Sequence, residues 1–312
     1  MASAAVKICE MSLRDGLQYL GGPNVPPERI VPLELRLRLV DALVAAGVRH
    51  VEVGSFVSPT GTPQMALSDE LGRRVDPAAA PGLELAGLVP NEAGFRRFAA
   101  TRLNMVALFP TASETHAREN FRGRTVDEVL AMAAAVARLA ADAGYPIRAH
   151  VSAAFQDIAI ANRGSDLETV VRVCRAVLGE MGCGWLTLAD TNGTATPPRI
   201  AEVLQAVGDA LGSLDRVGVH LHDRNGTALA NAAAAYERGV RIFDSSLTGI
   251  GGSVAASRAE GGSGHEMVGN IATESLVHLL HELGAATGID LEALRSSARP
   301  IVETIRRGGE RA

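Results

Sequence analysis

The chain has 312 residues, 47% of them hydrophobic, and a formal net charge of −5. This is ample for a sizeable core and exceeds the usual size of one domain unless the fold is an α/β barrel. Interspersed charges, the lack of a membrane-length apolar run or signal peptide, and three widely spaced cysteines predict a reduced, cytoplasmic protein that binds neither nucleic acid nor membrane.

Short buried segments alternate with helical segments along the whole chain. Helix boundaries are indicated by Gly47 as a C-cap, by Asn91 as an N-cap, and by Thr125 with Glu128 three residues later as a capping box. The predicted strands cover residues 6–13, 50–56, 83–89, 105–109, 147–154, 184–189, 216–222 and 241–246. The predicted helices cover residues 32–47, 92–102, 125–144, 166–182, 197–211, 228–239, 270–284 and 290–307.

About eight strand–helix repeats with short connections predict an α/β protein with a closed (β/α)₈ TIM barrel. We assign residues 1–285 to the barrel, the catalytic domain, and residues 286–312 to a C-terminal helical extension that packs on it. A doubly wound open sheet is the alternative. The first strand–helix turn carries no G-x-G-x-x-G, and no acidic residue sits where a dinucleotide ribose would need one.

The segment Val217–Asp223 contains two histidines separated by one residue. Successive side chains of a strand point to opposite faces, so His220 and His222 share a face. Two neutral imidazoles on one rigid face are half of a divalent-metal site. The alternative is a pair of ordinary histidines at a strand end.

Polar side chains gather at the predicted carboxyl ends of the strands, where a barrel carries its active site. We predict a metal site of Asp15, His220, His222 and Asn270, a mixed nitrogen and oxygen ligand set that suits Mg²⁺, Mn²⁺ or Co²⁺. Arg14, beside the carboxylate, is expected to stabilise an enolate oxygen, to form a buried ion pair with Glu52, or both. Asp190 is a candidate general base, with capping of the following turn as the alternative. The other strand-end residues that we single out are Gln18, Ser55, His150, Ser152, Asn192 and Asp223.

With these residues in place, the chain resembles the 3-hydroxy-3-methylglutaryl-CoA lyases, within the metal-dependent TIM-barrel lyases and Claisen-type synthases. The matching motifs span nearly the whole chain. They are Glu10, Arg14-Asp15-Gly16-Leu17-Gln18, Val51-Glu52, Ser55-Phe56-Val57-Ser58-Pro59, Pro63-Gln64-Met65, Val151-Ser152, Asp190-Thr191-x-Gly193, His220-x-His222-Asp223, Ala228-Leu229-Ala230-Asn231, Asp244-Ser245-Ser246 and Gly269-Asn270-x-Ala272-Thr273-Glu274.

The resemblance implies cleavage of a 3-hydroxyacyl-CoA to acetyl-CoA and a 3-oxo acid, in a homodimer. It places Asp15, His220, His222 and Asn270 on the family's metal ligands and Arg14 on its substrate-carbonyl arginine. Glu52 and Asp190 fall on its acid/base carboxylates. We count His220 among the catalytic residues, and we expect Arg14, Gln18, Ser152 and Asn192 to bind the substrate.

Two loops depart from the family pattern. Ser253 occupies the place of the lyases' lid cysteine, in a longer loop, and a serine hydroxyl is a far weaker acid than a thiol. We therefore expect His265 or Glu266 to deliver the proton, and count Ser253 and His265 as candidate catalytic residues. The loop of residues 155–158 also differs. The alternatives are a synthase that joins acetyl-CoA to a 2-oxo acid, and a non-catalytic binding protein.

Overall fold

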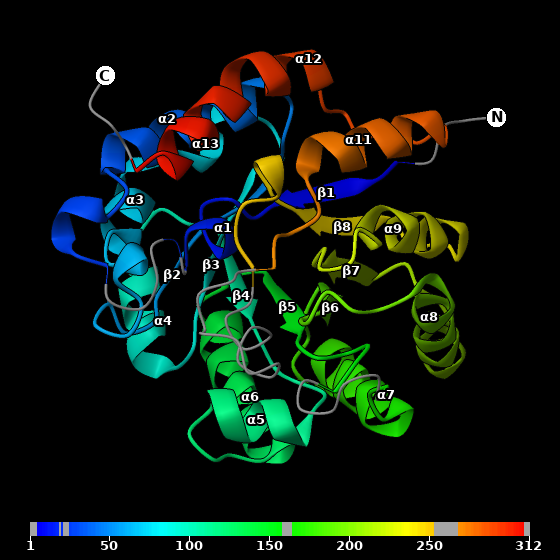
Figure 1. The fold of residues 1–312 in the computed structure, drawn as a ribbon. Coiled ribbons are helices and arrows are strands. Elements are labelled where there is room, and N and C mark those ends of the chain that lie inside the picture. The colour runs from blue at the N-terminus through cyan, green and yellow to red at the C-terminus, as the bar shows by residue number, and fades with distance from the viewer. Residues whose placement is uncertain (1–4, 19, 21–24, 158–163, 253–267, 309–312) are drawn as a thin grey trace.

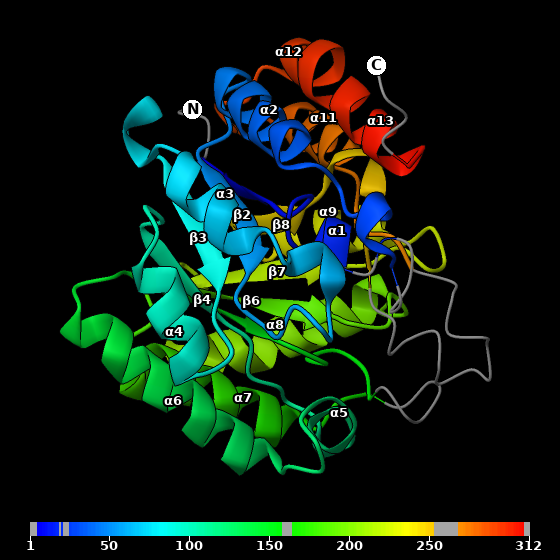
Figure 2. The same ribbon diagram turned by 90° about the vertical axis from the view of Figure 1, so that its left-hand side faces the viewer.

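The computed structural model describes residues 5–18, 20, 25–157, 164–252 and 268–308. Eight parallel strands close into a barrel, each paired with the next and β8 paired with β1. Figure 1 looks along this barrel, with the helices forming an outer ring, and Figure 2 shows it from the side. The predicted TIM barrel is therefore confirmed. The strands are β1 (Lys7–Glu10), β2 (His50–Ser55), β3 (Glu84–Leu88), β4 (Met105–Leu108), β5 (Ile147–Val151), β6 (Trp185–Asp190), β7 (Val217–Leu221) and β8 (Ile242–Ser245).

The helices follow the strands in the order of the sequence. A π-helical turn at Ala176–Glu180 extends α7, and another at Leu294–Ala298 joins α12 to α13. The described helices are α1 (Asp15–Gln18), α2 (Leu33–Ala45), α3 (Ser68–Arg74), α4 (Glu92–Ala99), α5 (Glu114–Asn120), α6 (Val126–Asp142), α7 (Leu167–Arg175), α8 (Pro197–Leu211), α9 (Ala228–Glu237), α11 (Thr273–Glu282), α12 (Leu291–Ala293) and α13 (Arg299–Arg306).

The predicted helix boundaries rest on caps that the structure contains. The Asn91 side chain accepts a hydrogen bond from the Gly94 amide at 2.9 Å. Thr125 and Glu128 form the expected capping box at the start of α6. Gly47, two residues beyond the end of α2, has a φ of 91°, which favours glycine.

Several predicted boundaries were wrong. The first strand ends at Glu10, and the short helices α1, α3 and α5 were not predicted. Asn270 does not begin a helix, because α11 starts at Thr273. The backbone around Asn270 is used by the barrel instead: the Ile271 amide donates to the Leu221 carbonyl, and the Ser246 amide donates to the Ile271 carbonyl.

The barrel interior is divided between an apolar and a polar layer. A small cluster of buried side chains from several strands, including Cys9, Met105, Trp185 and Ile242, is separate from the main core between strands and helices. Interior positions of such a barrel are packed, not open. Gly218 allows this packing, because a Cβ atom there would lie 2.5 Å from the Ile242 carbonyl oxygen.

The last helices pack against α2, on the outside of the barrel. Residues of α13 contact α2, and the two helices lie side by side in Figures 1 and 2. Helices α5 and α6 lie on the opposite side of the molecule. Among the described residues, none of the helices is long and apolar enough to span a membrane.

Candidate functional site

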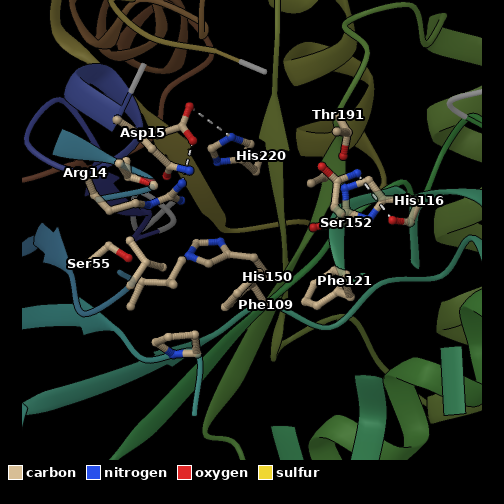
Figure 3. A pocket seen from close by; sticks show the side chains of 18 of the residues that line it. Arg14, Asp15, Ser55, Phe109, His116, Phe121, His150, Ser152, Thr191 and His220 are labelled. Atoms are coloured by element: carbon tan, nitrogen blue, oxygen red, sulfur yellow. Dashed lines mark hydrogen bonds and ion pairs between the residues drawn. The ribbon is translucent and has the colours of Figure 1, made fainter. Parts of the chain in front are cut away.

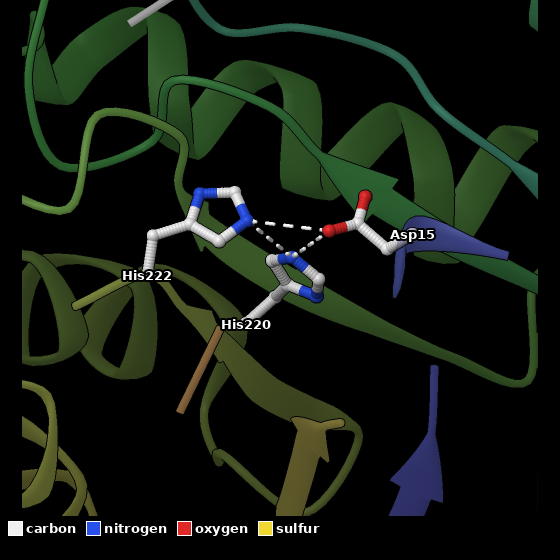
Figure 4. Close-up of side chains that lie close together, drawn as sticks. All are labelled: Asp15, His220 and His222. Atoms are coloured by element: carbon white, nitrogen blue, oxygen red, sulfur yellow. Dashed lines mark hydrogen bonds and ion pairs between the residues drawn. The ribbon is translucent and has the colours of Figure 1, made fainter. Parts of the chain in front are cut away.

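Asp15, His220 and His222 meet at the carboxyl ends of β1 and β7 (Figure 4). Asp15 Oδ2 lies 3.4 Å from His222 Nε2 and 4.0 Å from His220 Nε2, and the two imidazole nitrogens are 3.2 Å apart. Atoms bound at about 2.1 Å to one octahedral cation stand roughly 3.0–4.2 Å apart. These three atoms are therefore spaced as ligands of a single divalent cation.

The outer nitrogens of both imidazoles fix how the rings are protonated. His222 Nδ1 lies 3.1 Å from the Thr191 carbonyl oxygen, which can only accept, so this nitrogen carries the proton. His220 Nδ1 lies 3.2 Å from Asp244 Oδ2, a carboxylate oxygen. In the neutral rings both Nε2 lone pairs then face the Asp15 carboxylate. Three electron-pair donors pointed at one another require a cation between them, and the donor set fits a divalent metal.

Electrostatics at this point also favour positive charge. Burial alone would raise the pKa of Asp15, but Arg14 and the two imidazoles outweigh it and hold the pKa well below the usual range. Burial lowers the pKa of His220. For His222, burial is outweighed by Asp15, so its pKa is raised. The site thus attracts a proton to His222 in the absence of another cation.

Asn270 lies beside the cluster, through an isolated bridge between its backbone and that of His222. Its Nδ2 atom donates to Asp15 Oδ2 at 2.8 Å and to the Ile250 carbonyl at 3.2 Å. Rotating the side-chain amide of Asn270 by about 180° would place its oxygen where the nitrogen lies, beside Asp15. The four residues predicted as metal ligands are therefore neighbours in the fold.

Arg14 is held between two carboxylates. It forms an ion pair with Glu52 at 2.6 Å and with Asp15 at 2.5 Å, so the predicted buried pair with Glu52 is present. Burial alone would raise the pKa of Glu52, but His150 and Arg14 lower it to about 2. Glu52 also lies 2.9 Å from His150 Nε2. This clamp fixes the guanidinium at the edge of the cavity.

A third carboxylate, Asp244 in β8, organises the layer below the cluster of Asp15, His220 and His222, the proposed metal cluster. Its oxygens accept hydrogen bonds from Arg148 at 2.7 and 2.9 Å and from Thr187 at 2.9 Å, in addition to the contact with His220. Arg148 is fully buried and stacks 4.0 Å above the Trp185 ring. No role was predicted for Arg148 or Asp244 from the sequence, although each is a charged residue within an otherwise apolar strand, which is a signal of function.

A cavity of about 610 Å³ opens beside this cluster. Of the predicted site residues, Arg14, Asp15, Gln18, Ser152, His220 and His222 line the cavity. Figure 3 shows Arg14 and Asp15 on one side of it and Phe109, His116 and Phe121 on the other. Glu52 and Asn270 are buried and hold the lining residues from behind.

Two further predicted residues, Asp190 and Asn192, do not line the cavity either. Asp190 is fully buried, and its two oxygens accept hydrogen bonds from the amides of Thr194 and Ala195 at 3.2 and 3.0 Å. These contacts match the turn-capping alternative. Burial raises its pKa to about 6. Asn192 donates to the Asp157 carbonyl at 3.4 Å. Ser253, His265 and Glu266 lie outside the described residues.

Comparisons with known proteins agree with this geometry. The family model described as HMGL-like matches residues 5–301. The chain is 37% identical to the hydroxymethylglutaryl-CoA lyase of Pseudomonas mevalonii, over 93% of this chain and 89% of that protein. It is 35% identical to the (R)-citramalyl-CoA lyase of Chloroflexus aurantiacus, over 97% and 92%. The crystal structure of the HMG-CoA lyase from Brucella melitensis superposes with a TM-score of 0.85 and 33% identity, covering 98% of this chain and 100% of that one.

Proposed function

We propose, because the chain belongs to the HMGL-like family, that it is a divalent-metal-dependent lyase that cleaves a carbon–carbon bond of a 3-hydroxyacyl-CoA. The observation that carries this proposal is the convergence of two imidazole lone pairs and a carboxylate at the edge of the cavity. Asp15, His220, His222 and Asn270 are the proposed ligands. When bound, a divalent cation would polarise the substrate's tertiary alcohol as a Lewis acid.

The chemistry needs a base, an enolate-stabilising cation and an acid. Loss of the hydroxyl proton lets the bond between C2 and C3 break, with the electron pair moving through C2 onto the thioester oxygen. Protonation of C2 then gives acetyl-CoA, and C3 becomes the carbonyl of the oxo acid. We assign Arg14 to the thioester oxygen, because its guanidinium lines the cavity and Glu52 and Asp15 fix its position.

Other assignments stay predictions from the sequence. These are Glu52, Asp190, His220, Ser253 and His265 in catalysis, and Gln18, Ser152 and Asn192 in substrate binding. For Asp190, the bonds to two backbone amides favour the turn-capping role. The choice among Mg²⁺, Mn²⁺ and Co²⁺, the homodimer, the cytoplasmic location and the division at residue 285 are likewise predictions.

The substrate belongs, in our proposal, to the class that the relatives' names define. Hydroxymethylglutaryl-CoA and citramalyl-CoA are both 3-hydroxyacyl thioesters with a carboxylate, and they differ by one methylene group. A single methylene changes selectivity by only about 10- to 200-fold. Both therefore belong in the test.

The test is a cleavage assay on purified, chelator-treated protein with both thioesters, each with Mg²⁺, Mn²⁺ or Co²⁺ added back. We expect metal-dependent release of acetyl-CoA and an oxo acid from at least one thioester. Arg14→Gln should lower kcat by about 10²–10³-fold while far-UV circular dichroism is unchanged. Metal-dependent release of free thiol from acetyl-CoA and a 2-oxo acid, without cleavage, would instead establish the synthase. Neither reaction and no bound metal would support a binding protein.

A further inference from the structure

The cavity extends from the metal cluster to an aromatic wall on the β4 side, which the proposed chemistry does not use. Phe109, just after β4, and Phe121, just after α5, stack with ring centroids 5.3 Å apart and an interplanar angle of 29°. Both rings are half-buried and line the cavity, across from Arg14 and Asp15 in Figure 3. Such a wall provides apolar contact for a chain of atoms that leads away from the metal.

His116 adds an unmatched polar group to this wall. The residue lines the cavity and is only 7% exposed, and its Nδ1 has no hydrogen-bond partner among the described residues. Its ring packs edge-on against Phe121, with centroids 6.0 Å apart. A buried polar atom without a partner is unfavourable in the free protein, so a bound molecule that supplies a partner gains affinity.

Two arginines stand at the end of the same wall. Arg122 and Arg124 both line the cavity, and no carboxylate of the described residues lies within ion-pair distance of either guanidinium. The Arg124 guanidinium donates to the Phe121 carbonyl at 3.0 Å. Arg14, in contrast, is already neutralised by two carboxylates. Among the residues that the structure describes, two guanidinium groups without a carboxylate partner therefore line the cavity beside the aromatic wall.

The backbone at Arg122 makes an arginine costly there. Arg122 has a φ of 56°, just after the end of α5, where glycine is the favoured residue. The Gly123 amide closes the turn on the Arg118 carbonyl at 2.8 Å, without any contribution from the Arg122 side chain. The turn itself thus forms through backbone atoms and does not need a guanidinium at this position.

We propose that Arg122 and Arg124 bind an anionic group of the substrate, at the end of the aromatic wall formed by Phe109, His116 and Phe121. This inference rests on the proposed acyl-CoA substrate and assigns one end of it to a place in the cavity. The anion is a phosphate of the CoA nucleotide or a carboxylate of the acyl group. Guanidinium groups bind both through paired, charge-assisted hydrogen bonds.

The variants separate loss of charge from loss of fold. Arg122→Gly removes the guanidinium at a position that prefers glycine, so this variant should melt at or above the temperature of the natural protein. It is combined with Arg124→Ala. Arg118→Ala is the matched control, because Arg118 lies in α5, shortly before the two arginines in the chain, is 4.0 Å from Glu114, and does not line the cavity.

Binding is measured first by calorimetry, which needs no turnover, with CoA, adenosine 3′,5′-bisphosphate and 3-hydroxyglutarate as probes. We expect the double variant to bind one class of probe at least about tenfold more weakly, with the control unchanged. Weaker binding of CoA and the bisphosphate assigns the arginines to phosphate. Weaker binding of 3-hydroxyglutarate alone assigns them to the carboxylate.

The KM values for a CoA thioester and its pantetheine counterpart, which lacks the nucleotide, check the assignment. A phosphate site raises KM only for the CoA thioester, whereas a carboxylate site raises both. Unchanged binding of every probe by the double variant would overturn the inference. Arginine-dependent binding in a protein that cleaves no thioester would instead leave this site standing and remove the proposed lyase activity.

Discussion

Asp244→Asn tests whether the Asp244 carboxylate prepares His220 to bind the proposed divalent cation. The substitution keeps the shape of the side chain and removes its charge. In the natural protein the carboxylate accepts from Arg148, Thr187 and His220. Burial would raise its pKa, but Arg148 and the histidines outweigh that and keep it well below the usual range, so it is ionised at neutral pH.

Two separate losses are expected. Arg148 is fully buried, and removing the charge of its partner should destabilise the fold by about 3–5 kcal/mol. His220 loses the carboxylate that fixes its Nδ1 proton and increases the basicity of Nε2. Disturbing such a partner of a metal-binding histidine typically weakens metal affinity by about 10–100-fold, which corresponds to roughly 1.4–2.7 kcal/mol.

The double variant Arg148→Met/Asp244→Asn separates the two effects. It removes both buried charges, and methionine can keep the contact with the Trp185 ring. Much of the lost stability should return, because replacing a buried ion pair as a whole is nearly neutral. Metal affinity should stay low, because His220 still faces an amide. Thr187→Val, which removes one neutral donor to Asp244 at 2.9 Å, is the matched control.

The measurements are Mn²⁺ affinity by competition calorimetry and unfolding free energy in urea, on chelator-treated protein. We expect Thr187→Val to bind Mn²⁺ nearly as well as the natural protein. Natural-level Mn²⁺ affinity in Asp244→Asn would show that Asp244 only balances the charge of Arg148. Recovery of affinity in the double variant would also refute the reasoning, because it would make the metal loss a consequence of instability.

Three further predictions follow from single contacts. Mn²⁺ at 100 times its Kd should stabilise the chelator-treated protein by about 2.7 kcal/mol, and His222→Ala should abolish this gain in a thermal melt. Burial lowers the pKa of His116 from 6.5 to about 4, so stability is full above pH 6.5 and falls by about 3 kcal/mol as the pH drops through 4. His116→Leu should flatten that part of the urea-derived pH profile relative to the natural protein, and an unchanged slope would contradict it. Gly218→Ala should lower Tm by several degrees, because its Cβ would lie 2.5 Å from the Ile242 carbonyl oxygen, whereas Gly179→Ala, with nothing within 4 Å, should not.

The elements that carry the site could be predicted because their signals are local. Side chains alternate between the two faces of a strand, which places His220 and His222 on one face. Capping residues such as Asn91 and Thr125 mark the starts of helices. Barrel topology then places Asp15 and Asn270 near the histidines. The neighbourhood of Asp15, His220, His222 and Asn270 could therefore be predicted from the order of the strands in the sequence.

Other features depend on contacts between distant segments, which no local pattern reveals. Asp190 looks the same in sequence whether it faces substrate or caps a turn, and its bonds to two amides favour the second role. Asn270 was predicted to begin a helix, but the backbone of the neighbouring Ile271 bonds to Leu221 at the end of β7 and to Ser246 just after β8. The Arg148–Asp244 pair joins residues from β5 and β8, whose proximity only the closed barrel defines.

The closure of the barrel also has a consequence for how the protein is made. Lys7 pairs with Ile242 in the β1–β8 ladder. One edge of β1 therefore stays unpaired until the chain has been made as far as β8. Such long-range pairing slows folding, because the entropy of closing the loop is lost before the contacts form. During synthesis, β1 therefore leaves the ribosome with an unpaired edge. Asp15 follows β1 and Asn270 follows β8, so the hydrogen bond between them forms only once these two strands have paired.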